Sequence, residues 1–174
     1  MPSAPSLEHH DIPLNRDLFL RTLIRELAGI LEEVIGHEET AGYISLVGQK
    51  MGSWINGIYR QSLGLPTLSP EQTARVLVDL KRRLDGHFSL IELNEEKMVL
   101  SSSACPFGEK VLDRPSMCMM TSNVFGVITA ENLGYAKVAL HETIAGRCSR
   151  CLVTVFIKQT DESRATAGRE YFGE

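Results

Sequence analysis

Hydrophobic residues recur every three or four positions along the first half of the chain, which is the spacing of one buried face of a helix. The pattern predicts three helices, over residues 15–34, 38–62 and 69–85. Their apolar stripes are Leu20, Ile24, Leu27, Leu31 and Val34; Ile44, Val47, Met51, Ile55 and Ile58; and Val76, Leu77, Leu80 and Leu84. We expect these stripes to face the core, and charged side chains of the first helix, such as Arg25 and Glu32, to face water.

Capping residues mark the ends of these helices. Asn15 or Asp17 can cap the first helix. The third helix has a typical start, with Ser69 as the cap, proline at the first helical position and glutamine three residues after the cap. Lys81 lies in the last turns of the third helix, where its charge suits the negative end of the helix dipole.

The second predicted helix contains four glycines, and each costs a helix about 1 kcal/mol relative to alanine. They are Gly42, Gly48, Gly52 and Gly57. Close packing against another helix, a partner chain or a ligand would offset this cost. We therefore predict a homodimer that uses the face of this helix.

The second half of the chain changes to short strand-like segments around one more helix. Strands are predicted over residues 87–93, 97–103, 135–143 and 151–158, and a helix over residues 115–133. The fold class is therefore α+β, with N-terminal helices packed on an antiparallel sheet made of two hairpins that a cysteine-bearing helix separates. These elements form one domain, residues 15–159, between a flexible tail (1–14) and a polar C-terminal tail (160–174).

Composition excludes several classes of protein. With a net charge of −4 and a pI near 5.8, the chain has no electrostatic signature for binding nucleic acid or an anionic membrane. No segment approaches the roughly 18 apolar residues of a membrane span, and the N-terminus lacks the pattern of a secretory signal. We therefore expect a cytoplasmic protein, in which clustered cysteines serve metal binding or redox chemistry more often than permanent disulfides.

The four cysteines are the main chemical feature of the sequence. Cys105, Cys118, Cys148 and Cys151 are spaced C-x12-C-x29-C-x2-C. From Cys118 the predicted helix advances about 22 Å and the next strand returns about 26 Å, so the turn after that strand comes back to the start of the helix. All four thiols can therefore meet, and they suit zinc or an iron–sulfur cluster.

Other interpretations of the cysteines stay open. They can instead form a thiol–disulfide switch, or pack as small buried hydrophobic residues. His141 or Glu142 on the return strand could replace one of them as a ligand. Cys118 lies in the first turn of its helix, where the dipole is expected to lower the pKa of the thiol.

The run from residue 87 to residue 157 resembles the 4-vinyl reductase-like domains of sensor and regulatory proteins. The resemblance rests on a hairpin that leads into Cys105-Pro106, a helix that opens at Met117-Cys118, a strand that ends in His141-Glu142-Thr143, and Cys151 at the start of the last strand. It implies a small α+β fold related to trafficking-complex adaptors, a small, often hydrophobic ligand, and metal or redox positions at Cys118 and Cys151. The pair Cys148-x-x-Cys151 departs from the spacing that is usual in that family.

The leading prediction is a regulatory protein that senses a small apolar ligand or redox state and signals through a dimer or a separate signalling protein. The residues expected to line its apolar pocket are Met51, Trp54, Tyr59, Met120 and Phe125. The alternatives are a small enzyme that acts on a tetrapyrrole or another apolar substrate, and a non-catalytic adaptor. No hydrolase, P-loop, zinc-protease or dinucleotide motif is present, so nothing in the sequence requires catalysis.

Overall fold

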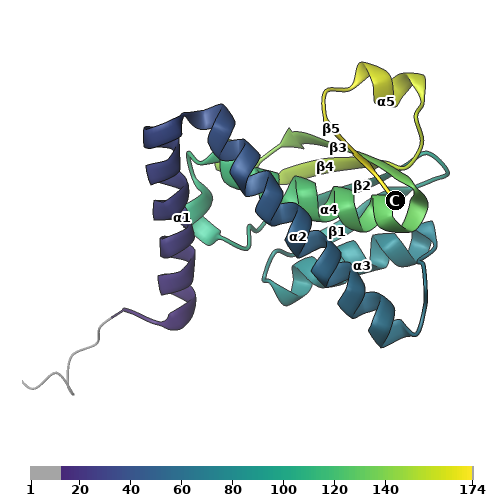
Figure 1. Ribbon diagram of the computed structural model, residues 1–174, viewed down its shortest axis with the longest axis horizontal. Coiled ribbons are helices and arrows are strands. Elements are labelled where there is room, and N and C mark those ends of the chain that lie inside the picture. Colours follow the sequence, from purple (N-terminus) through teal and green to yellow (C-terminus); the bar gives the residue numbers. More distant parts are fainter. Residues whose placement is uncertain (1–12, 174) are drawn as a thin grey trace, which may run out of the picture.

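Three helices precede a five-stranded antiparallel sheet in this computed structural model, which describes residues 13–173 (Figure 1). The helices are α1 (Arg16–Ile35), α2 (His37–Leu63), α3 (Pro70–Arg83), α4 (Cys118–Leu133) and α5 (Asp161–Ala165). The strands are β1 (Phe88–Leu93), β2 (Lys97–Ser102), β3 (Tyr135–Glu142), β4 (Cys151–Phe156) and β5 (Arg169–Phe172), in the order β1-β2-β4-β3-β5. Short 3-10 helices are η2 (Gly108–Val111), η3 (Pro115–Met117) and η4 (Ile144–Gly146). The α+β fold class predicted from the sequence is confirmed.

Local sequence signals set the ends of the helices. The side chain of Asn15 accepts a hydrogen bond from the backbone N–H of Leu18 and caps α1. Ser69 and Gln72 form a capping box at the start of α3. Gly134 ends α4 in the left-handed region at φ 85°, where a side chain is disfavoured.

Helix α4 lies at the centre of the molecule, with α2 on one side and the sheet on the other. Its inward side chains Phe125 and Ile128 are fully buried in the main core. A Cβ atom on Gly48 would lie 2.7 Å from Cβ of Asn123, and one on Gly52 would lie 2.9 Å from Cβ of Val127. Two of the four glycines of α2 therefore permit close packing on α4 within one chain.

Helix α1 contacts the rest of the molecule through a face of small and polar residues, on which Ala28 packs against Val111, Met117 and Ala145. The Arg25 guanidinium donates hydrogen bonds to the backbone oxygens of Lys110 (2.7 Å) and Leu112 (2.8 Å). The carboxylate of Glu32 accepts a hydrogen bond from the hydroxyl of Ser116. Arg25 and Glu32 were expected to face water, and that prediction is wrong because the surface that α1 covers offers them backbone carbonyls and the Ser116 hydroxyl as partners.

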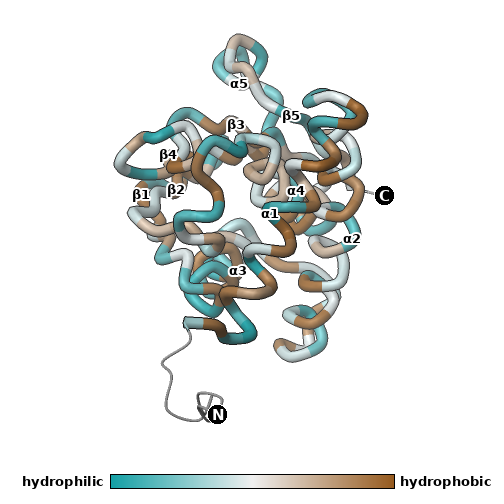
Figure 2. Tube along the Cα trace, turned by 90° about the vertical axis from the view of Figure 1, so that its left-hand side faces the viewer, coloured by the Kyte–Doolittle hydropathy of each residue, from teal (hydrophilic) through white to brown (hydrophobic). Residues whose placement is uncertain are grey.

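The apolar stripe of α1 faces outward as a result. Leu20 is 46% exposed, Leu27 54% and Val34 74%, so the prediction that this stripe lies in the core is also wrong. Helix α2 turns small and polar residues toward α4 and likewise exposes Val47 and Ile58. Figure 2 shows hydrophobic stretches, in brown, recurring along both helices.

The chain after residue 159 is part of the domain. It was expected to be a polar tail, but α5 and β5 form there, and β5 pairs with β3 as the edge strand of the sheet. The ring of Tyr171 packs on Gly126 of α4, where a Cβ atom would lie 2.1 Å from the ring. Burial of this one aromatic side chain fixes a segment whose other residues are mostly polar. The predicted N-terminal tail lies almost entirely outside the described residues.

Candidate functional site

A small pocket lies where the start of α4 meets one end of the sheet. Its walls combine thiols, hydroxyls and apolar side chains. Cys105 comes from the loop after β2, Cys118 and Thr121 from α4, Thr143 from the turn after β3, and Cys151 from the start of β4. The cavity measures about 30 Å³, which is room for about two water-sized groups.

The local structure explains why three of the four cysteines come together. Strand β3 runs back along α4, and the η4 turn then delivers Cys151 beside the start of the helix, where Cys118 lies. The backbone N–H of Ile144 lies 3.5 Å from Sγ of Cys151 and ties the turn to it. Cys148 is exposed in the turn and does not line the pocket.

Burial governs the chemistry of these thiols. It raises the pKa of Cys118 to about 12, with smaller contributions from the neighbouring Cys151 and Cys105. Burial also raises the pKa of the Cys105 thiol. The expectation that the helix dipole lowers the pKa of Cys118 is therefore wrong in direction, because desolvation outweighs the dipole. Both thiols are neutral at physiological pH.

Lys81 of α3 adds a positive charge that the sequence analysis did not connect with the cysteines. Its side chain is only 5% exposed, and Nζ donates a 2.7 Å hydrogen bond to the Thr121 hydroxyl in the pocket wall. Nζ also lies 5.5 Å from the ring centroid of Phe88 and 5.2 Å from that of Phe125. Burial lowers the pKa of Lys81 to about 8, while nearby Cys105, Cys151 and Cys118 act in the opposite direction.

The residues predicted to line an apolar pocket are spread over the molecule. Met51 and Trp54 are exposed on α2, and the Tyr59 hydroxyl donates a 2.7 Å hydrogen bond to Asp79. Met120 packs at the edge of the main core, and Phe125 is fully buried within it. The structure does not bring these five residues together around one cavity.

Metal binding by Cys105, Cys118, Cys148 and Cys151 stays a prediction. Within residues 13–173 no group of three or more histidine, cysteine, aspartate or glutamate side chains is placed to hold a metal ion. The two proposed substitutes have other partners, since His141 hydrogen-bonds to Thr154 and Glu142 pairs with Arg150.

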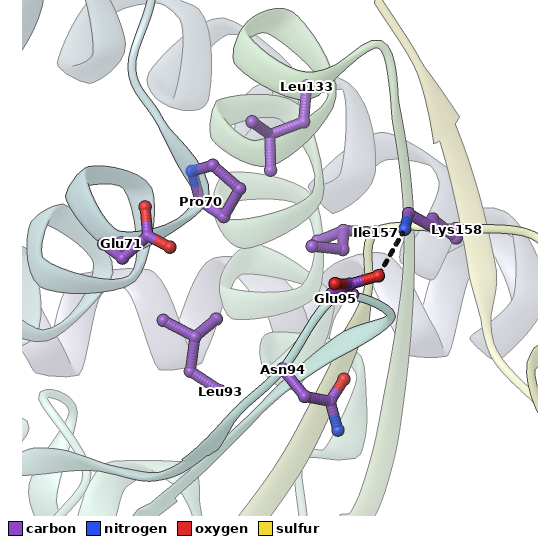
Figure 3. A pocket seen from close by; sticks show the side chains of 8 residues that line it. All are labelled: Pro70, Glu71, Leu93, Asn94, Glu95, Leu133, Ile157 and Lys158. Atoms are coloured by element: carbon purple, nitrogen blue, oxygen red, sulfur yellow. Dashed lines mark ion pairs between the residues drawn. The ribbon is translucent and has the colours of Figure 1, made fainter.

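A larger hollow, of about 500 Å³, opens at the opposite end of β4 (Figure 3). Leu93, Pro70, Leu133 and Ile157 surround it, and Glu95 forms an ion pair with Lys158 (3.6 Å) at its edge. This hollow is open to solvent. Of the charged side chains that line it, Glu95 and Lys158 pair with each other and Glu71 is exposed. We therefore take the cysteine pocket, which is less open, as the candidate site.

The fold occurs in proteins that bind quite different molecules. The structure matches the phenol-responsive sensory domain of the transcription activator PoxR, solved with phenol, with a TM-score of 0.62 over 90% of this chain and 82% of that one. It also matches trafficking protein particle complex subunit 3 from Naegleria fowleri, covalently bound to palmitic acid, with a TM-score of 0.57 over 81% and 96%. Both are 12% identical to this chain, so they show a shared fold, the one implied by the resemblance to adaptor-related domains.

The class of protein is thus a domain with the fold of sensory domains and trafficking-complex subunits. The chain belongs to the family described as methanogen output domain 1, whose model matches residues 23–156. No curated protein sequence matches the chain. Across residues 13–173 no helix has the length and hydrophobicity of a membrane span. The closer relationship to 4-vinyl reductase-like domains stays a prediction.

Proposed function

We propose that this protein is a regulatory domain that responds to a small ligand bound in the pocket lined by Cys105, Cys118 and Cys151. The observation that carries the proposal is the pocket itself. It is less open than the hollow of Figure 3, and it combines apolar walls with a few polar groups. It lies where α4, β1, β3 and β4 meet two connecting segments, the chain between β2 and α4 and the turn between β3 and β4. A ligand there would touch elements that are distant in sequence, so its binding can change how they pack.

Membership of an output-domain family supports a regulatory role over a metabolic one. The proteins with the same fold support a ligand site, because one was solved with phenol and the other with covalently bound palmitic acid. These ligands are not transferred to this chain, whose pocket is far smaller than a fatty acyl chain. A ligand of a few non-hydrogen atoms fits it without rearrangement.

Thiol labelling tests where ligands bind, with Cys148 as the control inside the same molecule. Because Cys148 is exposed and the other three thiols are half-buried around the pocket, iodoacetamide at pH 7.5 should modify Cys148 about tenfold faster or more. A molecule that binds the pocket should slow the other three further and leave Cys148 unchanged, as read by peptide mass spectrometry. If no small molecule that stabilises the protein protects these three thiols, the pocket is not the ligand site.

We further propose that the response passes through a homodimer formed by the outward faces of α1 and α2. These faces carry fourteen exposed large hydrophobic side chains: Phe19, Leu20, Leu23, Ile24, Leu27, Ile30, Val34, Tyr43, Leu46, Val47, Met51, Trp54, Ile58 and Leu63. Soluble monomers rarely expose large apolar surfaces, and a standard interface buries about 800 Å² per partner, so this many exposed side chains on two successive helices favour an interface.

A second copy fits this surface better than a dissimilar partner does. A two-fold interface must be complementary to itself, and a stripe of leucine and isoleucine meets that condition. Antiparallel pairing of two α1 helices also brings Arg16, near one end, alongside Glu33, near the other end, of the second copy. Opposite charges then lie at both ends of the apolar contact.

Light scattering after size exclusion tests the dimer. The wild-type protein should have the mass of two chains, and Leu27→Glu should have the mass of one, because a buried carboxylate in an apolar interface is costly. Ile91→Glu is the matched control, since Ile91 is 63% exposed on β1, away from α1 and α2, and this variant should remain dimeric. A monomeric wild-type protein at about 100 μM would overturn the dimer, since a specific dimer of this size should form well below that concentration.

A further inference from the structure

Lys81 carries a buried positive charge directly behind two residues of the cysteine-pocket wall. Its Nζ is held 2.7 Å from the hydroxyl of Thr121, which lines the cavity, and it lies over the ring of Phe88, which lines it too. Three thiols of the cavity wall, those of Cys105, Cys118 and Cys151, are close enough to act on the charge of this amine. The ammonium therefore lies against two residues of the cavity wall, although Lys81 itself is not one of the lining residues.

The charge of Lys81 has no counter-charge in the part of the chain that the structure describes. The ammonium has three N–H donors, and the hydrogen bond to Thr121 uses one of them. None of the ion pairs formed by residues 13–173 includes Lys81. The thiols of Cys105 and Cys118 do not supply the missing charge, because burial raises the pKa of both and keeps them protonated. A buried cation without an anion is costly and calls for one from outside the chain.

We propose that the pocket binds a small organic monoanion whose negative charge pairs with the ammonium of Lys81. The inference rests on the proposed ligand-binding function and specifies the class of ligand. The volume of about 30 Å³ admits only the smallest organic acids. Formate matches it, and acetate, larger by one methyl group, is the second probe. Leu140 and Val153 in the wall would contact the hydrogen or methyl end, while the carboxylate lies toward Lys81 and Thr121.

Because Cys105 and Cys118 are neutral, the arrangement is selective for charge. A neutral molecule of the same shape would leave the ammonium unpaired, whereas a carboxylate satisfies it and accepts the free N–H donors. A dianion would bring a second charge into apolar walls, where it would have no partner. Size and charge therefore select together for a small carboxylate.

Thermal unfolding with matched probes tests the inference. Sodium acetate and formate should raise the Tm of the wild-type protein with increasing concentration, whereas acetamide, formamide and sodium chloride at equal ionic strength should not. Lys81→Met should lose the response to acetate completely. Lys158→Met is the matched control, because Lys158 is exposed beyond the far end of β4, and it should respond as the wild type does.

A second measurement needs no variant and so does not depend on whether Lys81→Met folds. Acetate should bind about tenfold or more weakly at pH 9.5 than at pH 7, because Lys81 loses its charge as the pH rises through its pKa of about 8. The groups that face Lys81 from other elements are Cys105, Cys118 and Cys151, and any thiolate formed there at high pH would weaken acetate binding further.

Each contrary outcome has its own meaning. Equal stabilisation and equal thiol protection by acetate and acetamide would overturn the role of the Lys81 charge and leave the pocket as a ligand site. Stabilisation by acetate that survives in Lys81→Met would also overturn it, because the anion would then bind elsewhere. If no probe changes the Tm or protects the three pocket thiols, the inference falls, and the proposed function then depends on larger ligands in the labelling test.

Discussion

Lys81 and Cys118 show that burial, more than local sequence, sets the chemistry of single residues in this protein. Both have a helix terminus as a neighbour, and in both the dipole argument assigns an exposed, charged form. The structure buries both, so the pKa of Lys81 falls to about 8 and that of Cys118 rises to about 12. Placing a charge on either residue therefore costs the folded state free energy.

The sequence held one signal for Lys81. It lies four residues after Leu77 and three before Leu84, so it occupies the apolar stripe of α3. A lysine on such a stripe is usually expected to extend along it and reach water. Only the tertiary arrangement, with Phe88 and Phe125 across its path, shows that its amine ends inside.

Lys81→Met should stabilise the protein without ligand at pH 7 by roughly 2–3 kcal/mol, because it removes a buried charge. The folded pKa lies below the unfolded value of 10.5, so the unfolded chain binds more protons between about pH 8 and 10.5, and wild-type stability rises there with pH. The advantage of the variant should therefore be largest below pH 8 and should shrink as the pH rises through this window.

Urea unfolding at pH 7 and pH 10 measures this difference. The thiols and tyrosines also titrate in this range, but they do so in both proteins and largely cancel in the comparison. A variant that is less stable than the wild type at pH 7 would mean that the hydrogen bond to Thr121 and the aromatic contacts outweigh the buried charge.

At the scale of elements, α1 and α2 mark the limit of pattern analysis. Periodicity located both helices, because it depends only on the spacing of hydrophobic residues along the chain. It could not show what the stripe of Leu20, Leu27 and Val34 faces, since an apolar stripe fits a core and an interface equally well. The presence of α1 was predicted correctly, but the direction in which its apolar stripe faces was not.

The glycines of α2 give a test within one helix. Gly48→Ala should destabilise the fold by about 1–3 kcal/mol, because the new Cβ would meet Asn123 at 2.7 Å and force α2 away from α4. Gly57→Ala should instead stabilise it by about 1 kcal/mol through helix propensity, because nothing lies within 4 Å of the added atom. Chemical denaturation measures both changes. If Gly57→Ala weakens the dimer, that glycine serves the contact between copies.

At the scale of the whole molecule, the order of elements and the convergence of distant cysteines follow from lengths that the sequence contains. A helix and a strand of similar length that run in opposite directions return the chain to its starting point, and this brings Cys151 to Cys118. Cys148 is exposed because the turn before Cys151 faces solvent. The two cysteines are only three residues apart, and arguments from element length cannot tell which of them enters the pocket.

The last strand escaped prediction for a different reason. Its four residues are too few for alternation to be recognised, and what holds β5 in place is pairing with β3 and packing on α4, both far away in sequence.

The contact of β5 with α4 predicts how much the C-terminal segment contributes to the stability of the molecule. Tyr171 is 5% exposed, its ring packs on Gly126, and its hydroxyl lies 2.9 Å from that of Ser122. Tyr171→Ala should therefore cost about 3–5 kcal/mol, as expected for a cavity left by an aromatic side chain. Phe172→Ala, one residue on and 67% exposed, should cost less than about 1 kcal/mol. Equal and small losses for both variants in urea unfolding would show that β5 is a separable tail, as the sequence first indicated.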